Sequence, residues 1–109
     1  YKRDYIYVKD AVNSYVVIAE NLHKKEIKGQ GFNFGNDKPL KVLEIVKEIQ
    51  KLMGKEKLKP RILDIAKGEI KDQYLISKKA RKLLKWKPNY TLEQGLKETI
   101  EWYNNFFKN

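Results

Sequence analysis

The sequence predicts an α/β fold, a small mixed domain of short strands and about four helices. Short runs of aromatic and β-branched residues alternate with longer stretches in which apolar residues recur at helical spacing. Glycine, proline, asparagine and aspartate gather between these segments, as they do in turns. Because 109 residues suit one modest core, we expect residues 1–109 to form a single domain.

The first element is expected to be a short strand that runs directly into a helix. Residues 5–8, Tyr-Ile-Tyr-Val, are aromatic or β-branched, and Asp10 stands where a helix N-cap belongs. We expect a buried helix at about residues 11–22, a turn at residues 29–31 and a second short strand at residues 32–34. The expected inward face of this helix comprises Ala11, Tyr15, Ile18, Ala19 and Leu22, widened by Val12 and Val16.

The clearest helical pattern lies in the middle of the chain. It follows Pro39 and Leu40, and Gly54 supplies a left-handed residue at its C-terminal end. Its apolar face comprises Val42, Ile45, Val46, Ile49, Leu52 and Met53. An exposed linker and another short strand, at residues 60–64, are expected to follow.

Two further helices complete the chain. Ser77 is placed to cap a short basic helix at residues 78–84, and Pro88 prevents that helix from continuing. Thr91 and Gln94 form a capping box for the last helix, at about residues 92–107. The residues expected to face inward are Ala80, Leu83 and Leu84 in the first helix, and Leu92, Leu96, Ile100, Tyr103 and Phe107 in the second.

The composition excludes several kinds of site. The chain has no cysteine and one histidine, His23, so neither a disulfide framework nor a thiolate or histidine-built metal site is expected. The absence of cysteine makes the reducing cytoplasm the expected compartment. No apolar run approaches the roughly 20 residues that span a bilayer, so no membrane association is expected.

The charge is strongly positive, with 24 Lys and Arg against 14 Asp and Glu and a formal net charge of +10. Such a field attracts nucleic acid, an acidic protein or a phosphorylated small molecule, and its sign does not choose among them. No zinc-finger, ribonucleoprotein or basic-zipper pattern accompanies the charge, so nucleic acid is the weaker expectation.

A complete catalytic set is missing from the pattern. No glycine-rich loop lies between a strand and a helix, and Asp64, Glu69 and Asp72 match no metal-binding loop. The Tyr-x-x-x-Lys spacing occurs at Tyr5 and at Tyr74, but the first lies in the expected strand, where residues four apart are about 13 Å apart. The second straddles a helix cap. The chain alone therefore predicts a binding or scaffold unit with no catalytic, cofactor or metal residues.

Arg3 is the candidate binding residue of the N-terminal segment. Arg3 lies in the polar residues just before the expected strand, where its guanidinium could bind an anion or remain a solvated charge. The chain begins at Tyr1, and its only methionine is Met53, so we expect it to start inside a longer polypeptide or to follow processing.

Five segments in order resemble a known family. The N-terminal segment, residues 3–11, is similar to the Arg-Asp-aromatic-hydrophobic-x-Val-x-Asp motif of extended short-chain dehydrogenase/reductases, the nucleotide-sugar epimerases and 4,6-dehydratases. Residues 31–35 (GFNFG) and 42–46 (VLEIV) resemble their next strand and helix. Residues 79–88 (KARKLLKWKP) resemble their Lys-Ala-x-x-x-Leu-Gly-Trp-x-Pro segment, and residues 92–103 (LEQGLKETIEWY) their terminal helix.

The resemblance implies the C-terminal substrate-binding part of a Rossmann-type enzyme whose nucleotide-binding domain is absent from this chain. That domain would bind NAD or NADP and carry the catalytic tyrosine and lysine, so the isolated chain is expected to be inactive. The implied partners are a nucleotide-sugar substrate and the missing domain, in a full-length enzyme that is expected to be a homodimer. Arg3 would contact the substrate diphosphate, because guanidinium matches phosphate oxygens bidentately.

The chain departs from the family at two places. The Arg-Pro-Gly loop, a second phosphate contact in the family, is replaced by residues 66–69, Ala-Lys-Gly-Glu, which leaves Lys67 as the nearest cationic candidate. Lys85 stands where the family has glycine before Trp86, at a cost of roughly 1 kcal/mol if the position is left-handed. Two other hypotheses remain, a basic module that binds nucleic acid or an acidic protein, and a structural fragment without a ligand.

Overall fold

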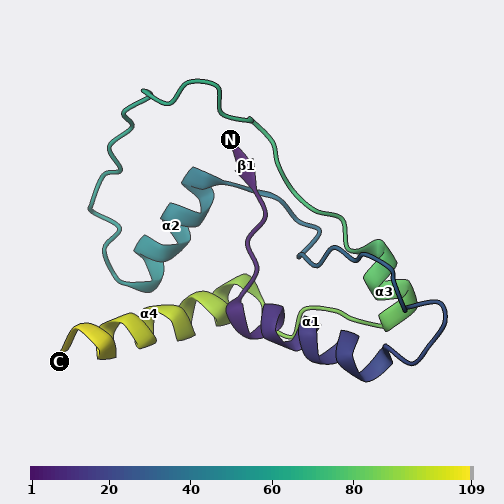
Figure 1. The fold of residues 1–109 in the computed structure, drawn as a ribbon. Coiled ribbons are helices and arrows are strands. Elements are labelled where there is room, and N and C mark those ends of the chain that lie inside the picture. The colour runs from purple at the N-terminus through teal and green to yellow at the C-terminus, as the bar shows by residue number, and fades with distance from the viewer. Residues whose placement is uncertain (109) are drawn as a thin grey trace.

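The structure, a computed structural model, describes residues 1–108, and that range contains four helices and one two-stranded sheet. In chain order the elements are β1 (Lys2–Arg3), α1 (Val8–Asn21), β2 (Leu40–Lys41), α2 (Val42–Leu52), α3 (Lys78–Leu84) and α4 (Leu92–Lys108). Two helix pairs, α1 with α3 and α2 with α4, lie on either side of the N-terminal segment (Figure 1). The small mixed α/β class is therefore confirmed, in an open shape of 53 × 38 × 21 Å.

The sheet is small and lies away from the predicted strands. β1 pairs with β2 in antiparallel fashion, with Lys2 opposite Lys41, and Lys2 also bridges to Asp72 in parallel. The prediction of a strand at residues 5–8 was wrong, because the ladder partners reach only the two residues of β1 and the helix already begins at Val8. Residues 32–34 and 60–64 also form no strand, since neither segment meets a ladder partner among residues 1–108.

The core lies where α3 packs against α1. Ile27, Ala80, Leu84 and Trp86 are buried there, and the Phe34 ring meets Trp86 edge-on at a centroid distance of 5.1 Å. The partly buried residues that pack around them are Ile6, Val17, Ile18, Phe32, Phe34 and Leu83. The inward face predicted for the basic helix is thus confirmed, and it anchors that end of the molecule.

Of the inward face predicted for the first helix, Ile18 packs against the core, but most of the other residues point outward. Tyr15 is 76% exposed, and Val12, Val16 and Leu22 are exposed as well. The fully buried residues of α1 are instead Asp10 and Ser14, and Val17 also packs against the core. Apolar periodicity identifies a face that is suited to burial, but the face that packs in the described chain is rotated from it and shares only Ile18 with its core contacts.

Asp10 is not an N-cap, because Tyr7 occupies that position and makes no side-chain capping bond. The Asp10 carboxylate accepts hydrogen bonds from the Asn89 amide, at 2.7 Å, and from the Tyr90 amide, at 3.3 Å. It therefore fixes the linker that enters α4. This bond joins residues 79 positions apart, a pairing that local capping rules cannot reveal.

Several local predictions were confirmed. Gly54 has φ +65° just after α2, and Lys85 has φ 53° at the end of α3, both in the left-handed region. Thr91 and Gln94 exchange the two hydrogen bonds of a capping box. Ser77 is the N-cap of α3 by position, but its hydroxyl bonds to Gly35 O, Asp37 and the Arg81 side chain and caps no backbone amide of the helix.

The outer half of α4 differs from its prediction. Leu92, Leu96 and Ile100 are half-buried, whereas Tyr103 and Phe107 are 50% and 76% exposed. Figure 1 shows the helix running on past α2 to the C-terminus, and the aromatic residues of its last turns are exposed. In the described range, no helix is long and apolar enough to cross a membrane.

Candidate functional site

Arg3 lies at the junction of β1 and the long loop that joins α2 to α3. Its Nη1 donates to the carbonyl oxygens of Lys2, at 2.7 Å, and Lys71, at 3.1 Å. Its Nη2 forms an ion pair with Glu69 at 3.3 Å. The side chain is 25% exposed, so Arg3 is anchored against the loop and is not the solvated charge that the sequence allowed.

This geometry leaves Arg3 able to bind an anion. The three bonds leave its Nε hydrogen and one Nη2 hydrogen without partners among residues 1–108. The Glu69 carboxylate is 46% exposed, so it competes for Arg3 only as a partly solvated charge. A ligand with two or more anionic oxygens can therefore share or displace that contact.

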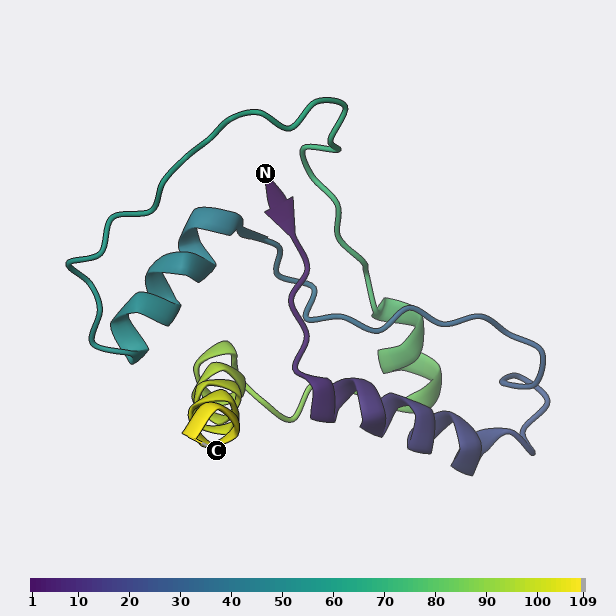
Figure 2. The same cartoon turned by 60° about the vertical axis from the view of Figure 1, so that its left-hand side comes forward.

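Lys67 is exposed in the same loop, two residues before Glu69. The loop thus places Lys67 and Arg3, both predicted to bind the substrate, in neighbouring segments that lie 64 positions apart in sequence. Figures 1 and 2 show this loop as a long arc between α2 and α3, next to the strand β1. Sequence reasoning missed Glu69 as the partner of Arg3, because no local pattern indicates a contact between them.

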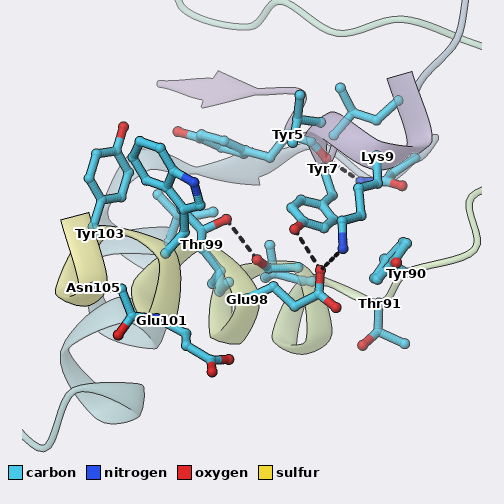
Figure 3. Close-up of a pocket in the computed structure, with 18 residues that line it drawn as sticks. Tyr5, Tyr7, Lys9, Tyr90, Thr91, Glu98, Thr99, Glu101, Tyr103 and Asn105 are labelled. Atoms are coloured by element: carbon cyan, nitrogen blue, oxygen red, sulfur yellow. Dashed lines mark hydrogen bonds and ion pairs between the residues drawn. The ribbon is translucent and has the colours of Figure 1, made fainter. Parts of the chain in front are cut away.

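A separate cavity of about 860 Å³ lies between the N-terminal segment and α4. Tyr5, Tyr7 and Lys9 line one wall, and Glu98 and Trp102 of α4 line the other, with Ile45 of α2 contributing at one end. In Figure 3 the Tyr7 hydroxyl and the Lys9 ammonium both point at Glu98. The lining is mixed, because apolar and aromatic side chains alternate with this charged group and with further polar residues, among them Glu101 and Asn105.

The polar contacts in this cavity are short. The Tyr7 hydroxyl donates to Glu98 Oε2 at 2.6 Å, and Lys9 Nζ lies 3.0 Å from the same oxygen. These hydrogen bonds from Tyr7 and Lys9 lower the pKa of Glu98, whereas the bond to Glu98 raises the pKa of Tyr7 and that of Lys9. The phenol therefore holds its proton more tightly than free tyrosine, which is the opposite of what a tyrosine base requires.

Lys9, the lysine of the Tyr5 and Lys9 spacing, pairs with Glu98. Tyr7 fixes α4 against the start of α1. A Cβ at Gly95 would lie 3.0 Å from the Tyr7 Cβ, so the close approach of α4 depends on this glycine. Glu98 was not identified from the sequence, because it stands 91 positions from Tyr7.

A third polar group caps α3 from outside the helix. The Asp37 carboxylate accepts from the amide of Ser77, at 2.6 Å, from its hydroxyl and from Arg81 Nε, both at 2.7 Å. Burial works against the charge, but these bonds outweigh it and hold the pKa of Asp37 below its usual value. Asp37 has φ 58°, so the cap is reached through a left-handed backbone.

No model of a protein family matches the chain. It is 32% identical over 101 residues to the UDP-glucuronate 4-epimerase of Thermodesulfobacterium geofontis, which covers 92% of this chain and 29% of that protein. The solved UDP-glucose 4-epimerase of Thermotoga maritima, crystallised with UDP-glucose, matches 98% of this chain and 33% of its own, with 28% identity and a TM-score of 0.81. By homology, the chain belongs to the extended short-chain dehydrogenase/reductases.

A second solved member of this family extends the match. The UDP-glucuronic acid 4-epimerase of Bacillus cereus, in complex with NAD, covers 98% of this chain and 32% of its own, with 25% identity and a TM-score of 0.75. The chain spans about a third of the length of these short-chain dehydrogenase/reductases. The matched proteins include UDP-sugar 4-epimerases, a trifunctional UDP-glucose 4,6-dehydratase and a dTDP-glucose 4,6-dehydratase, and the match is to their C-terminal part.

Proposed function

We propose that the chain is the substrate-binding portion of an NAD-dependent nucleotide-sugar 4-epimerase or 4,6-dehydratase. The observation that carries this proposal is the match of nearly the whole chain to an epimerase crystallised with UDP-glucose. The comparisons give no support to the alternative of a free-standing basic module that binds nucleic acid or an acidic protein. The net charge of +10 suits a diphosphate ligand as well as it suits nucleic acid or an acidic protein.

Within this portion, Arg3 and Lys67 contact the diphosphate of the substrate. The support is geometric, because Arg3 is held against the loop that carries Lys67 and keeps two donors available. Arg3 supplies a planar guanidinium that can bind two phosphate oxygens at once, and Lys67 supplies a single ammonium charge on a flexible side chain. Glu69 lowers the affinity of this site for the diphosphate, because it occupies one of the guanidinium donors of Arg3.

The NAD of the proposed enzyme is held outside residues 1–109. Gly29 and Gly31 precede a segment without a helix, so they do not offer the helix N-terminus that binds a pyrophosphate. The role of this chain is to hold and orient the nucleotide-sugar, while the nucleotide-binding portion supplies the redox chemistry. We therefore expect the 109-residue chain alone to convert no nucleotide-sugar when NAD is added.

Binding is tested in a chimera that joins the N-terminal two thirds of the Thermotoga maritima enzyme to residues 1–109. Calorimetry with UDP is expected to show binding that Arg3→Ala weakens about tenfold to hundredfold, since charge-assisted hydrogen bonds contribute about 1.5–3 kcal/mol each. Lys67→Ala has a smaller effect. Arg61→Ala, which removes an exposed cation from the same loop, is the matched control and leaves the affinity unchanged.

Glu69→Gln is a second test, and a misfolded variant cannot imitate its expected result, which is tighter binding. Because it removes the competing carboxylate, it is expected to tighten UDP binding severalfold. Unchanged UDP affinity in both Arg3→Ala and Glu69→Gln would contradict the assignment of Arg3. A chimera that binds NAD but shows no UDP binding would contradict the proposed function itself.

A further inference from the structure

The Asp4 carboxylate is bound through both of its oxygens. Oδ1 accepts from the amide of Asn36 at 3.4 Å, and Oδ2 accepts from the amide of Leu75 at 3.3 Å. These partners lie 32 and 71 positions away, in the segment before β2 and near the end of the loop that joins α2 to α3. Asp4 therefore joins three segments of the chain at the point where β1 ends.

The place of this carboxylate is fixed by its surroundings. A Cβ at Gly35 would lie 3.1 Å from Asp4 Cγ and closer still to Oδ2, so the carboxylate fills the space that a side chain at this position would need. The Asn36 side chain also donates to the carbonyl oxygen of Tyr5, which ties the same segment to the N-terminal chain a second time. Asp4 is thus held from the side of residues 35–36, and its contact with Leu75 holds the loop to that fixed point.

Backbone contacts hold the same loop on the other side of Arg3. The Lys2 amide donates to Lys71 O at 2.8 Å, and the Gln73 amide donates to Lys2 O at 3.1 Å. The Arg3 guanidinium itself reaches the loop through Lys71 O and Glu69. The loop is therefore bonded to the residue before Arg3 through the backbone and to the residue after it through a side chain.

We propose that Asp4 is a positioning residue of the diphosphate site. By holding Leu75, it keeps the loop that carries Lys67 at a set place against the Arg3 guanidinium. Asp4 acts through Arg3, because a carboxylate repels a diphosphate and cannot bind it directly. The inference rests on the proposed function, since it takes Arg3 to bind the diphosphate.

The sign of the change in affinity separates positioning from simple charge. Loss of a nearby negative charge alone would tighten UDP binding, by about twofold at most in screened solution. In the same chimera, Asp4→Ala is expected to weaken UDP binding by about threefold to tenfold. This loss is smaller than that of Arg3→Ala, because both Asp4 bonds are long and the contacts of Lys2 remain. Asp4→Asn, which keeps one oxygen acceptor, is expected to recover part of the affinity.

Asp72→Ala is the matched control for charge. Asp72 is exposed in the same loop, and its backbone, rather than its side chain, bridges to Lys2. This control is expected to leave UDP affinity unchanged or to raise it by up to about twofold. Gly35→Ala, which crowds the Asp4 carboxylate, is expected to weaken UDP binding as Asp4→Ala does, whereas Gly31→Ala is not.

A double-mutant cycle tests whether Asp4 acts through Arg3. In the Arg3→Ala chimera, Asp4→Ala is expected to change UDP affinity by less than about twofold, because the guanidinium that it positions is gone.

Hydrogen exchange of the 109-residue chain tests the contact with the loop in the absence of UDP. Asp4→Ala is expected to speed exchange of the Gln73 amide by about tenfold, although the acceptor of that amide, Lys2 O, is unchanged. The Lys55 amide, which bonds to Gln50 O at the other end of the loop, is the internal control and keeps its rate.

Three results would overturn the inference. The first is UDP affinity that is unchanged or higher in Asp4→Ala, in a chimera where Arg3→Ala weakens binding. The second is an equal loss from Asp4→Ala with and without Arg3. The third is unchanged exchange at the Gln73 amide, which counts against Asp4 whether or not UDP binds. An unsubstituted chimera that binds NAD but not UDP contradicts the proposed function instead.

Discussion

Replacement of Asp10 by alanine is expected to detach α4 from the start of α1. Asp10 is 2% exposed and accepts one short and one long amide hydrogen bond, from Asn89 at 2.7 Å and from Tyr90 at 3.3 Å. Net contributions of hydrogen bonds to charged groups are about 1.5–3 kcal/mol each, and a 3.3 Å bond is weaker than the mean. Asn89 is exposed, so water recovers part of the loss.

The expected cost of Asp10→Ala is therefore about 2–4 kcal/mol in the free energy of unfolding. Asp10→Asn is expected to cost less, about 1–2 kcal/mol, because one amide keeps its acceptor while the other meets an NH₂ group. Urea unfolding of the 109-residue chain, followed by far-ultraviolet circular dichroism, measures both values.

Ser14→Ala is the matched control. Ser14 is also buried in α1, but its hydroxyl bonds only within the helix, to Ala11 O. We expect a loss below about 1 kcal/mol, since the hydroxyl donates a single local bond. If Asp10→Ala destabilised the chain no more than Ser14→Ala does, the reasoning that Asp10 anchors the α4 linker would be refuted.

Three further predictions concern stability, the first two in the same urea unfolding assay and the third in a pH series of melting temperatures. Gly35→Ala is expected to cost about 1–3 kcal/mol, because its Cβ would lie 3.1 Å from the Asp4 Cγ and still closer to Oδ2, whereas Gly31→Ala has open space and should be nearly neutral. Lys85→Gly is expected to stabilise the chain by about 1 kcal/mol by relieving the left-handed backbone at φ 53°, and an equal gain from Lys85→Ala would contradict this explanation. The pKa of Asp37 is lowered in the folded state, so the ionised carboxylate stabilises the fold fully above its unfolded pKa of about 4. This stabilisation is lost as the pH falls through the lower folded pKa. The melting temperature should therefore fall over that pH range, and Asp37→Asn should make the fall smaller.

Local chemistry accounts for the parts of the fold that the sequence predicted. The Thr91 and Gln94 box, the left-handed Gly54 and the break before Pro88 each depend on residues a few positions apart. Such interactions form in any chain that carries them, so the helices after residue 40 were predicted almost to the residue. The strands failed because a strand needs a ladder partner, and the described residues supply partners only at Lys2 and Arg3.

The candidate site was predicted in part. The sequence identified Arg3 and Lys67, through the resemblance, and their binding roles stay predictions. It did not identify Glu69, which lies 3.3 Å from Arg3, or Glu98, which binds Tyr7. Both contacts join segments far apart in sequence, where no periodicity or capping rule applies.

The sequence by itself determined the helix positions, the turns and the family, because these follow from short-range geometry and from five motifs in order. Only the tertiary structure decided which face of α1 is buried, that Asp10 binds the α4 linker, and that Arg3 meets the long loop. Periodicity indicates that a helix has an apolar face, whereas contacts between distant segments determine which face packs and against which element. Phe32 and Phe34 illustrate the difference. Their alternating burial is typical of a strand, but a β-ladder also needs a partner strand, which local sequence does not supply.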